Sequence, residues 1–75
     1  MATVFIDKEK LGQAYKYANL IRNKAKRDYA NAYIAWLRNG AEGLEPERGK
    51  LSCMAAQAVR MNIDAMKLWE GTYAA

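Results

Sequence analysis

Histidine is absent from this chain of 75 residues, and cysteine and proline each occur once. A single thiol, Cys53, cannot form a disulfide within the chain, and the usual ligands of structural zinc are missing. General acid–base catalysis commonly uses histidine or a desolvated pair of carboxyl groups, and the eight carboxylates here are scattered along the sequence. No glycine-rich phosphate-binding motif occurs. The sequence therefore predicts a protein that is not an enzyme and uses no metal or cofactor.

Long apolar runs are also absent. No stretch approaches the ~20 apolar residues that cross a bilayer. Residues 1–7 lack the basic region and the apolar length of a signal peptide. A lone cysteine is typical of a reducing compartment. We therefore expect a cytoplasmic protein that does not associate with membranes.

The apolar spacing predicts an all-α fold. Asp7 suits the N-cap of a long helix over residues 8–38, and Asn39-Gly40 is a typical left-handed stop after it. Residues 41–49 are the expected connection, and a second helix is expected over about residues 47–70. Because short connections favour antiparallel packing, we predict one antiparallel helical hairpin as the single domain.

Both ends of the chain are expected to lie outside this hairpin. Residues 1–7 form a short arm, in which residues 2–6 favour extended geometry but have no second strand to pair with. Residues 72–75 form a loose tail.

The long helix has more apolar residues than a hairpin can cover. Leu20, Ile34 and Leu37 fall on the side away from its main apolar stripe, and residues 29–37 are apolar nearly all round. Either the arm folds over this outer face or a second chain covers it, and five or six arm residues cover only part. We therefore expect a homo-oligomer, and its predicted interface residues are Leu20, Tyr33, Ile34, Leu37 and Asn62.

Asn62 interrupts the apolar face of the second helix. A buried asparagine there either pairs across a symmetry axis or bonds to a tyrosine hydroxyl of the first helix.

The positive charge is concentrated in the first helix. The whole chain has a formal net charge of +4, whereas residues 8–38 hold eight Lys or Arg against two carboxylates. The candidate residues for binding nucleic acid or an anionic ligand are Lys16, Arg22, Lys24, Lys26 and Arg27. Tyrosines at the borders of the apolar stripe add candidates for stacking on bases. The alternative is that these lysines and arginines only keep the outer face of a long helix soluble.

In its small size, basic charge and alanine- and tyrosine-rich hairpin without a catalytic motif, the chain resembles the small helical accessory proteins encoded by bacteriophages. The resemblance rests on size and composition, and it transfers no functional residue. It implies an accessory or inhibitor protein. We therefore predict a protein-binding module that acts as a homo-oligomer on another protein, with nucleic-acid or anion binding through the basic helix face as the alternative.

Overall fold

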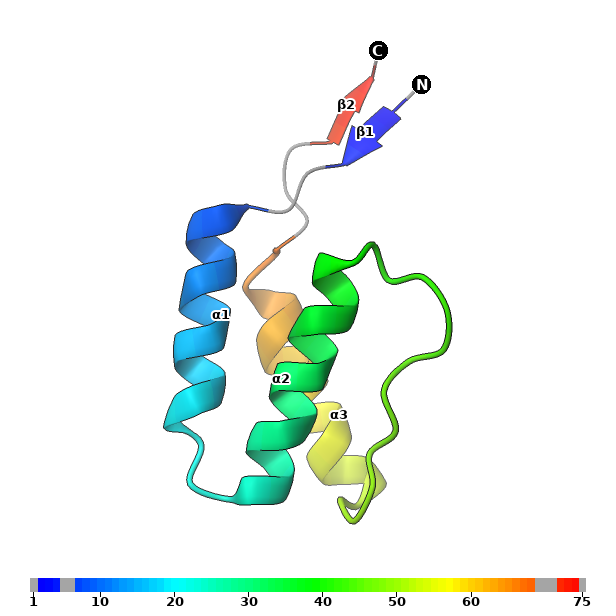
Figure 1. Cartoon of the computed structure of the whole chain (residues 1–75). Coiled ribbons are helices and arrows are strands. Elements are labelled where there is room, and N and C mark those ends of the chain that lie inside the picture. The colour runs from blue at the N-terminus through cyan, green and yellow to red at the C-terminus, as the bar shows by residue number, and fades with distance from the viewer. Residues whose placement is uncertain (1, 5–6, 69–71, 75) are drawn as a thin grey trace.

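The computed structural model describes residues 2–4, 7–68 and 72–74. Along the chain, the elements are β1 (Ala2–Val4), α1 (Lys8–Leu20), α2 (Lys24–Arg38), α3 (Cys53–Ala65) and β2 (Thr72–Ala74). The three helices of the described part pack together, and the two short strands lie beyond one end of them (Figure 1). The fold is therefore all-helical in its core, as the composition and the apolar spacing predict.

The prediction of one helix over residues 8–38 is wrong, because these residues form two helices, α1 and α2. The Asp7 side chain caps α1 as expected, accepting from the backbone N–H groups of Glu9 and Lys10. The backbone then becomes extended at Ile21 and Asn23, and the Asn23 side chain accepts from the N–H of Lys26 at 3.0 Å. Asparagine is a strong N-cap residue because its short side chain bonds to free backbone donors. The chain therefore turns back at residues 21–23.

The second predicted helix, 47–70, is shorter than expected. It begins at Cys53 after the N-cap Ser52, whose hydroxyl accepts from the N–H of Ala55 at 3.1 Å, and it ends at Ala65. Residues 66–68 are not helical, and residues 69 and 70 lie outside the described part. The predicted stop after α2 is confirmed: Gly40 has a φ of +92° and its N–H bonds to the carbonyl of Leu37. The connection is consequently residues 39–52 rather than 41–49.

The helix directions also differ from the prediction. The antiparallel hairpin is formed by α1 and α2, whereas α2 and α3 run in the same general direction (Figure 1). Two side-chain bonds fix that direction: Arg60 Nη1 donates to Tyr29 Oη at 2.9 Å, and Tyr33 Oη donates to Asp64 Oδ1 at 2.8 Å. Both bonds join residues 31 apart, as in a parallel pair. The long connection returns the chain to the end where α2 begins.

The two strands pair the ends of the chain. In β1 and β2, Ala2 lies opposite Ala74 and Val4 opposite Thr72, in an antiparallel register. Residues 2–4 therefore have a strand partner that the sequence analysis did not find. Residues 72–74 are paired where a loose tail was expected.

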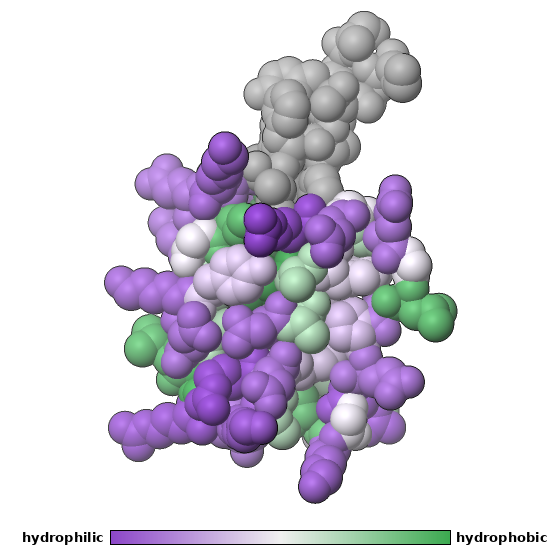
Figure 2. All heavy atoms as spheres, in the orientation of Figure 1, coloured by the Kyte–Doolittle hydropathy of each residue, from purple (hydrophilic) through white to green (hydrophobic). Residues whose placement is uncertain are grey.

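The core lies between the three helices. Its buried side chains are Ala14, Ala18, Tyr29, Ala30, Tyr33, Ile34, Leu37, Leu51, Ala56, Val59, Ile63 and Leu68. The buried residues of α1 are the alanines Ala14 and Ala18, whose small side chains permit the close approach of a neighbouring helix. Ile34 of α2 belongs to the same cluster and has no exposed surface. The outside is largely hydrophilic in the view of Figure 2, with only isolated hydrophobic areas. No helix in the described ranges is long and apolar enough to cross a membrane.

Candidate nucleic-acid interface

The turn between α1 and α2 gathers four of the five predicted basic residues. Arg22 lies in the turn itself, and Lys24 and Lys26 lie in the first turn of α2, all three exposed. Arg27 is half-buried and its guanidinium donates to the carbonyl of Ile21 at 3.2 Å. Asn23 places these residues, because its cap begins a new helix in the middle of the basic run.

Lys24 and Lys26 lie at the N-terminus of α2, where positive charge destabilises a helix. The free N–H groups at a helix N-terminus carry partial positive charge, so lysine or arginine there costs about 0.3–1 kcal/mol each at low ionic strength. The first turn of α2 contains no acidic residue. One ion pair offsets the charge: Lys24 Nζ lies 3.5 Å from Asp28 Oδ2, with 81% and 62% of the two side chains exposed. Such an exposed pair contributes only ~0.3–0.5 kcal/mol. The start of α2 therefore has more positive charge than its nearby carboxylate offsets.

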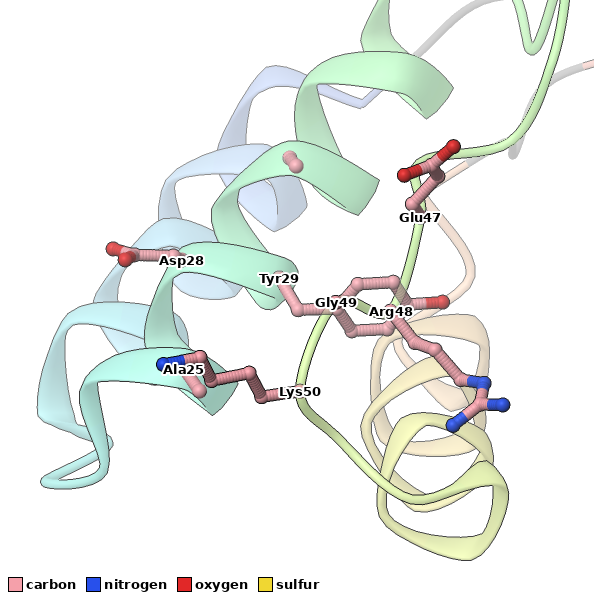
Figure 3. A pocket seen from close by; sticks show the side chains of 8 residues that line it. Ala25, Asp28, Tyr29, Glu47, Arg48, Gly49 and Lys50 are labelled. Atoms are coloured by element: carbon pink, nitrogen blue, oxygen red, sulfur yellow. The ribbon is translucent and has the colours of Figure 1, made fainter.

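The tertiary structure adds two basic residues that the sequence analysis missed. A cleft of about 270 Å³ lies between α2 and the chain just before α3 (Figure 3). Its lining residues are Ala25, Asp28, Tyr29, Ala32, Glu47, Arg48, Gly49 and Lys50. Lys24 and Lys50 also line a neighbouring depression. We call Arg22, Lys24, Lys26, Arg27, Arg48 and Lys50 the basic end.

The side chains of Arg48 and Lys50 are held differently. Arg48 donates to the carbonyl of Leu51 at 2.6 Å, which holds the bend before α3. Lys50 is exposed, and in Figure 3 it extends across the start of α2. Because Lys50 lies 26 positions after Lys24, no local spacing could have joined the two. Only the parallel arrangement of α2 and α3 does so.

Lys16, the fifth predicted basic residue, stands apart. It is exposed on α1, more than one helical turn before the connection to α2. The cleft and the depression at the basic end do not include it. It therefore lies outside the basic end.

The predicted oligomer interface is largely part of the chain's own core, which corrects the prediction. Tyr33, Ile34 and Leu37 are buried in the core between the three helices, and the hydroxyl of Tyr33 donates to Asp64 of α3. Leu20 is 74% exposed at the end of α1. Asn62 is exposed and its amide donates to the hydroxyl of Tyr17 at 3.1 Å, so the tyrosine alternative is the one observed.

Tyr33 is held in its neutral form. Burial raises the pKa of its hydroxyl above the usual value, and the hydrogen bond to Asp64 raises it further. Tyr29 is buried as well. Neither ring is accessible for stacking on a base, so the basic end presents charge and hydrogen-bond donors rather than aromatic surfaces.

The described part of the chain contains no group of three or more cysteine, aspartate or glutamate side chains that could hold a metal ion. Cys53 is an exposed free thiol at the start of α3. Comparison with protein-family models, with curated proteins and with solved structures gives no match.

Proposed function

We propose that this protein is a non-enzymatic binding protein that contacts the phosphate backbone of nucleic acid through its basic end. The observation that carries the proposal is that Lys24 and Lys50 line one depression at the start of α2, with Lys26 in the same first turn of the helix. Two of the three come from one helix and the third from a distant loop.

The distribution of charge favours a phosphate-binding role for the basic end over a role in solubility alone. The cleft itself is balanced, because Arg48 and Lys50 line it together with Asp28 and Glu47. The excess of positive charge lies beside it, where the only carboxylate within residues 22–28 is Asp28. The four cations there are Arg22, Lys24, Lys26 and Arg27. A face that serves only solubility has no reason to place cations at a helix N-terminus, where they lower stability. A bound phosphate removes that cost, because it lies against the positive end of the helix and several ammonium groups at once.

The burial of the tyrosines determines how the basic end can contact nucleic acid. Since Tyr29 and Tyr33 are buried, base stacking on them is excluded, and exposed lysines bind phosphates without reading sequence. Binding should therefore be independent of sequence and strongly dependent on salt. Each phosphate contact to duplex DNA contributes about 0.9 to the slope of log affinity against log salt concentration.

The test is fluorescence anisotropy with labelled duplex DNA over a range of salt concentrations. The double variant Lys26→Gln/Lys50→Gln should bind more weakly and lower the magnitude of the salt slope by about 2. The matched control is Lys8→Gln/Arg38→Gln, which makes the same change in net charge at the opposite end of the helices (Figure 1). Two duplexes of unrelated sequence should bind equally well.

Two results would refute the proposal. One is the absence of binding at low salt. The other is an equal loss of affinity in both double variants, because that would indicate a response to net charge alone.

The alternative of a homo-oligomeric protein-binding module cannot use the face first predicted for it. Ile34 has no exposed surface and Leu37 is only 8% exposed, so neither side chain can pack against a partner without unfolding of the hairpin. Any association through apolar surface must use side chains that remain exposed.

A further inference from the structure

The outward side of α3 has an apolar stripe. Its four exposed members are Met54, Ala58, Met61 and Ala65. Met54 is 81% exposed and Met61 62% exposed, although both are large apolar side chains. At 100° per residue, the steps of four, three and four place the four residues on one narrow face of the helix. Its borders have three exposed residues: Gln57 and Asn62, which are uncharged, and Asp64, whose carboxylate accepts a hydrogen bond from Tyr33.

This stripe is separate from the core of the monomer. The opposite side of α3 packs inward through Ala56, Val59 and Ile63. The stripe therefore has no partner among the described residues, although its spacing is that of a coiled-coil seam. Charged residues make up 27% of the chain, yet none interrupts this face.

We propose that this stripe joins two copies of the chain through antiparallel pairing of α3 about a twofold axis. In that register Met54 lies opposite Ala65 of the second copy, and Ala58 lies opposite Met61 of the second copy. Every layer then places a large side chain against a small one, which is how helices fill an interface without gaps. A parallel register would place methionine against methionine and alanine against alanine.

The charge distribution favours the same arrangement. The basic end lies where α2 and α3 begin, so a parallel pair would bring two strongly positive surfaces together. An antiparallel pair separates them by about the 20 Å length of α3, which exceeds the ~8 Å screening length at physiological ionic strength. The uncharged stripe is thus a face on which two copies of a protein with net charge +4 meet without facing like charges.

The size of the stripe sets the strength of the dimer. One face of a helix of 13 residues is smaller than the roughly 800 Å² per partner of a standard stable interface. We therefore expect association only in the upper micromolar range. This expectation is independent of nucleic-acid binding, because the stripe contains no residue of the basic end.

Sedimentation equilibrium from about 10 µM to about 1 mM tests the dimer. The average mass should rise from 8.5 kDa toward twice that value with increasing concentration. Ala58→Glu introduces a charge in the stripe at an exposed helical position, so it should preserve the circular dichroism spectrum and weaken association about tenfold or more. Gln13→Glu introduces the same charge on the exposed side of α1 and should behave like the unmodified chain.

A swap of side chains tests the register. Met61→Ala leaves a gap opposite Ala58, and Ala58→Met places two methionines together, so each variant alone should weaken association. The double variant restores large-against-small packing and should recover the original dissociation constant. A chain that stays monomeric at the highest concentration, or an Ala58→Glu variant that dimerises normally, overturns the dimer. Losses that simply add in the double variant overturn the antiparallel register.

Discussion

Replacing Ile34 and Leu20 separately by alanine distinguishes the observed fold from a straight helix over residues 8–38. Both substitutions remove three carbon atoms, but Ile34 has no exposed surface and Leu20 is 74% exposed. At about 0.8 kcal/mol per buried carbon, Ile34→Ala loses ~2.4 kcal/mol of transfer free energy, and the remaining cavity raises the loss to about 3–4 kcal/mol. Only a quarter of the Leu20 side chain is buried, so Leu20→Ala should cost less than ~0.6 kcal/mol.

The assay is urea unfolding followed by circular dichroism, at two protein concentrations that differ by about tenfold. A chain of this size has roughly 4–11 kcal/mol of total stability, so Ile34→Val, at about 1 kcal/mol, serves if the alanine variant does not fold. The loss at Ile34 should not depend on concentration, because α1 of the same chain covers it. Similar losses at both positions that shrink as concentration rises would refute this assignment and restore an intermolecular interface at residues 29–37.

Two further predictions concern the hydrogen bonds and the backbone. Tyr33→Phe removes the bond to Asp64 and should lower the free energy of unfolding by about 1 kcal/mol in urea titrations at neutral pH. Because the pKa of Tyr33 is raised in the folded state, its neutral hydroxyl contributes full stability below the unfolded value near 10, and that contribution falls as pH rises above 10. The Phe variant should therefore lose less stability than the unmodified chain between pH 9 and about 11, and an equal loss would refute the assignment to Tyr33. Gly12 lies exposed inside α1 with open space at its Cβ position, so Gly12→Ala should raise the melting temperature by stabilising the helix by about 0.5–1 kcal/mol; a lowered melting temperature would contradict it.

Capping chemistry explains which helix ends could be located. Asp7 comes just before an apolar repeat begins and Gly40 just after one ends, so the start of α1 and the end of α2 follow from local preference. Asn23 is also a good cap, but helix-forming residues lie on both sides of it. An asparagine inside a helix costs only ~0.7 kcal/mol relative to alanine. Local preference alone therefore could not decide between one helix and two.

The basic site was predictable only in part. Arg22, Lys24 and Lys26 are close in sequence, so any fold with a turn or a helix there brings them together. Lys50 joins them because the connection 39–52 returns to the start of α2. An extended chain of 14 residues reaches up to roughly 46 Å, whereas α2 is about 22 Å long, so this connection allows α3 to run parallel to α2.

The sequence alone determined the helical class and the positive charge of the first half of the chain, because composition and periodicity fix these whatever the packing. It also showed that residues 29–37 have more apolar surface than one neighbouring helix can cover. The tertiary structure decided what covers that surface. Breaking the helix at residues 21–23 costs a few backbone hydrogen bonds that caps and water partly replace. It permits the packing of three helices that buries Ile34, Leu37 and the two tyrosines that hydrogen-bond to α3. The free energy gained by burying these large side chains exceeds the free energy lost with the backbone hydrogen bonds. It depends on contacts between distant residues, so no local sequence pattern reveals it.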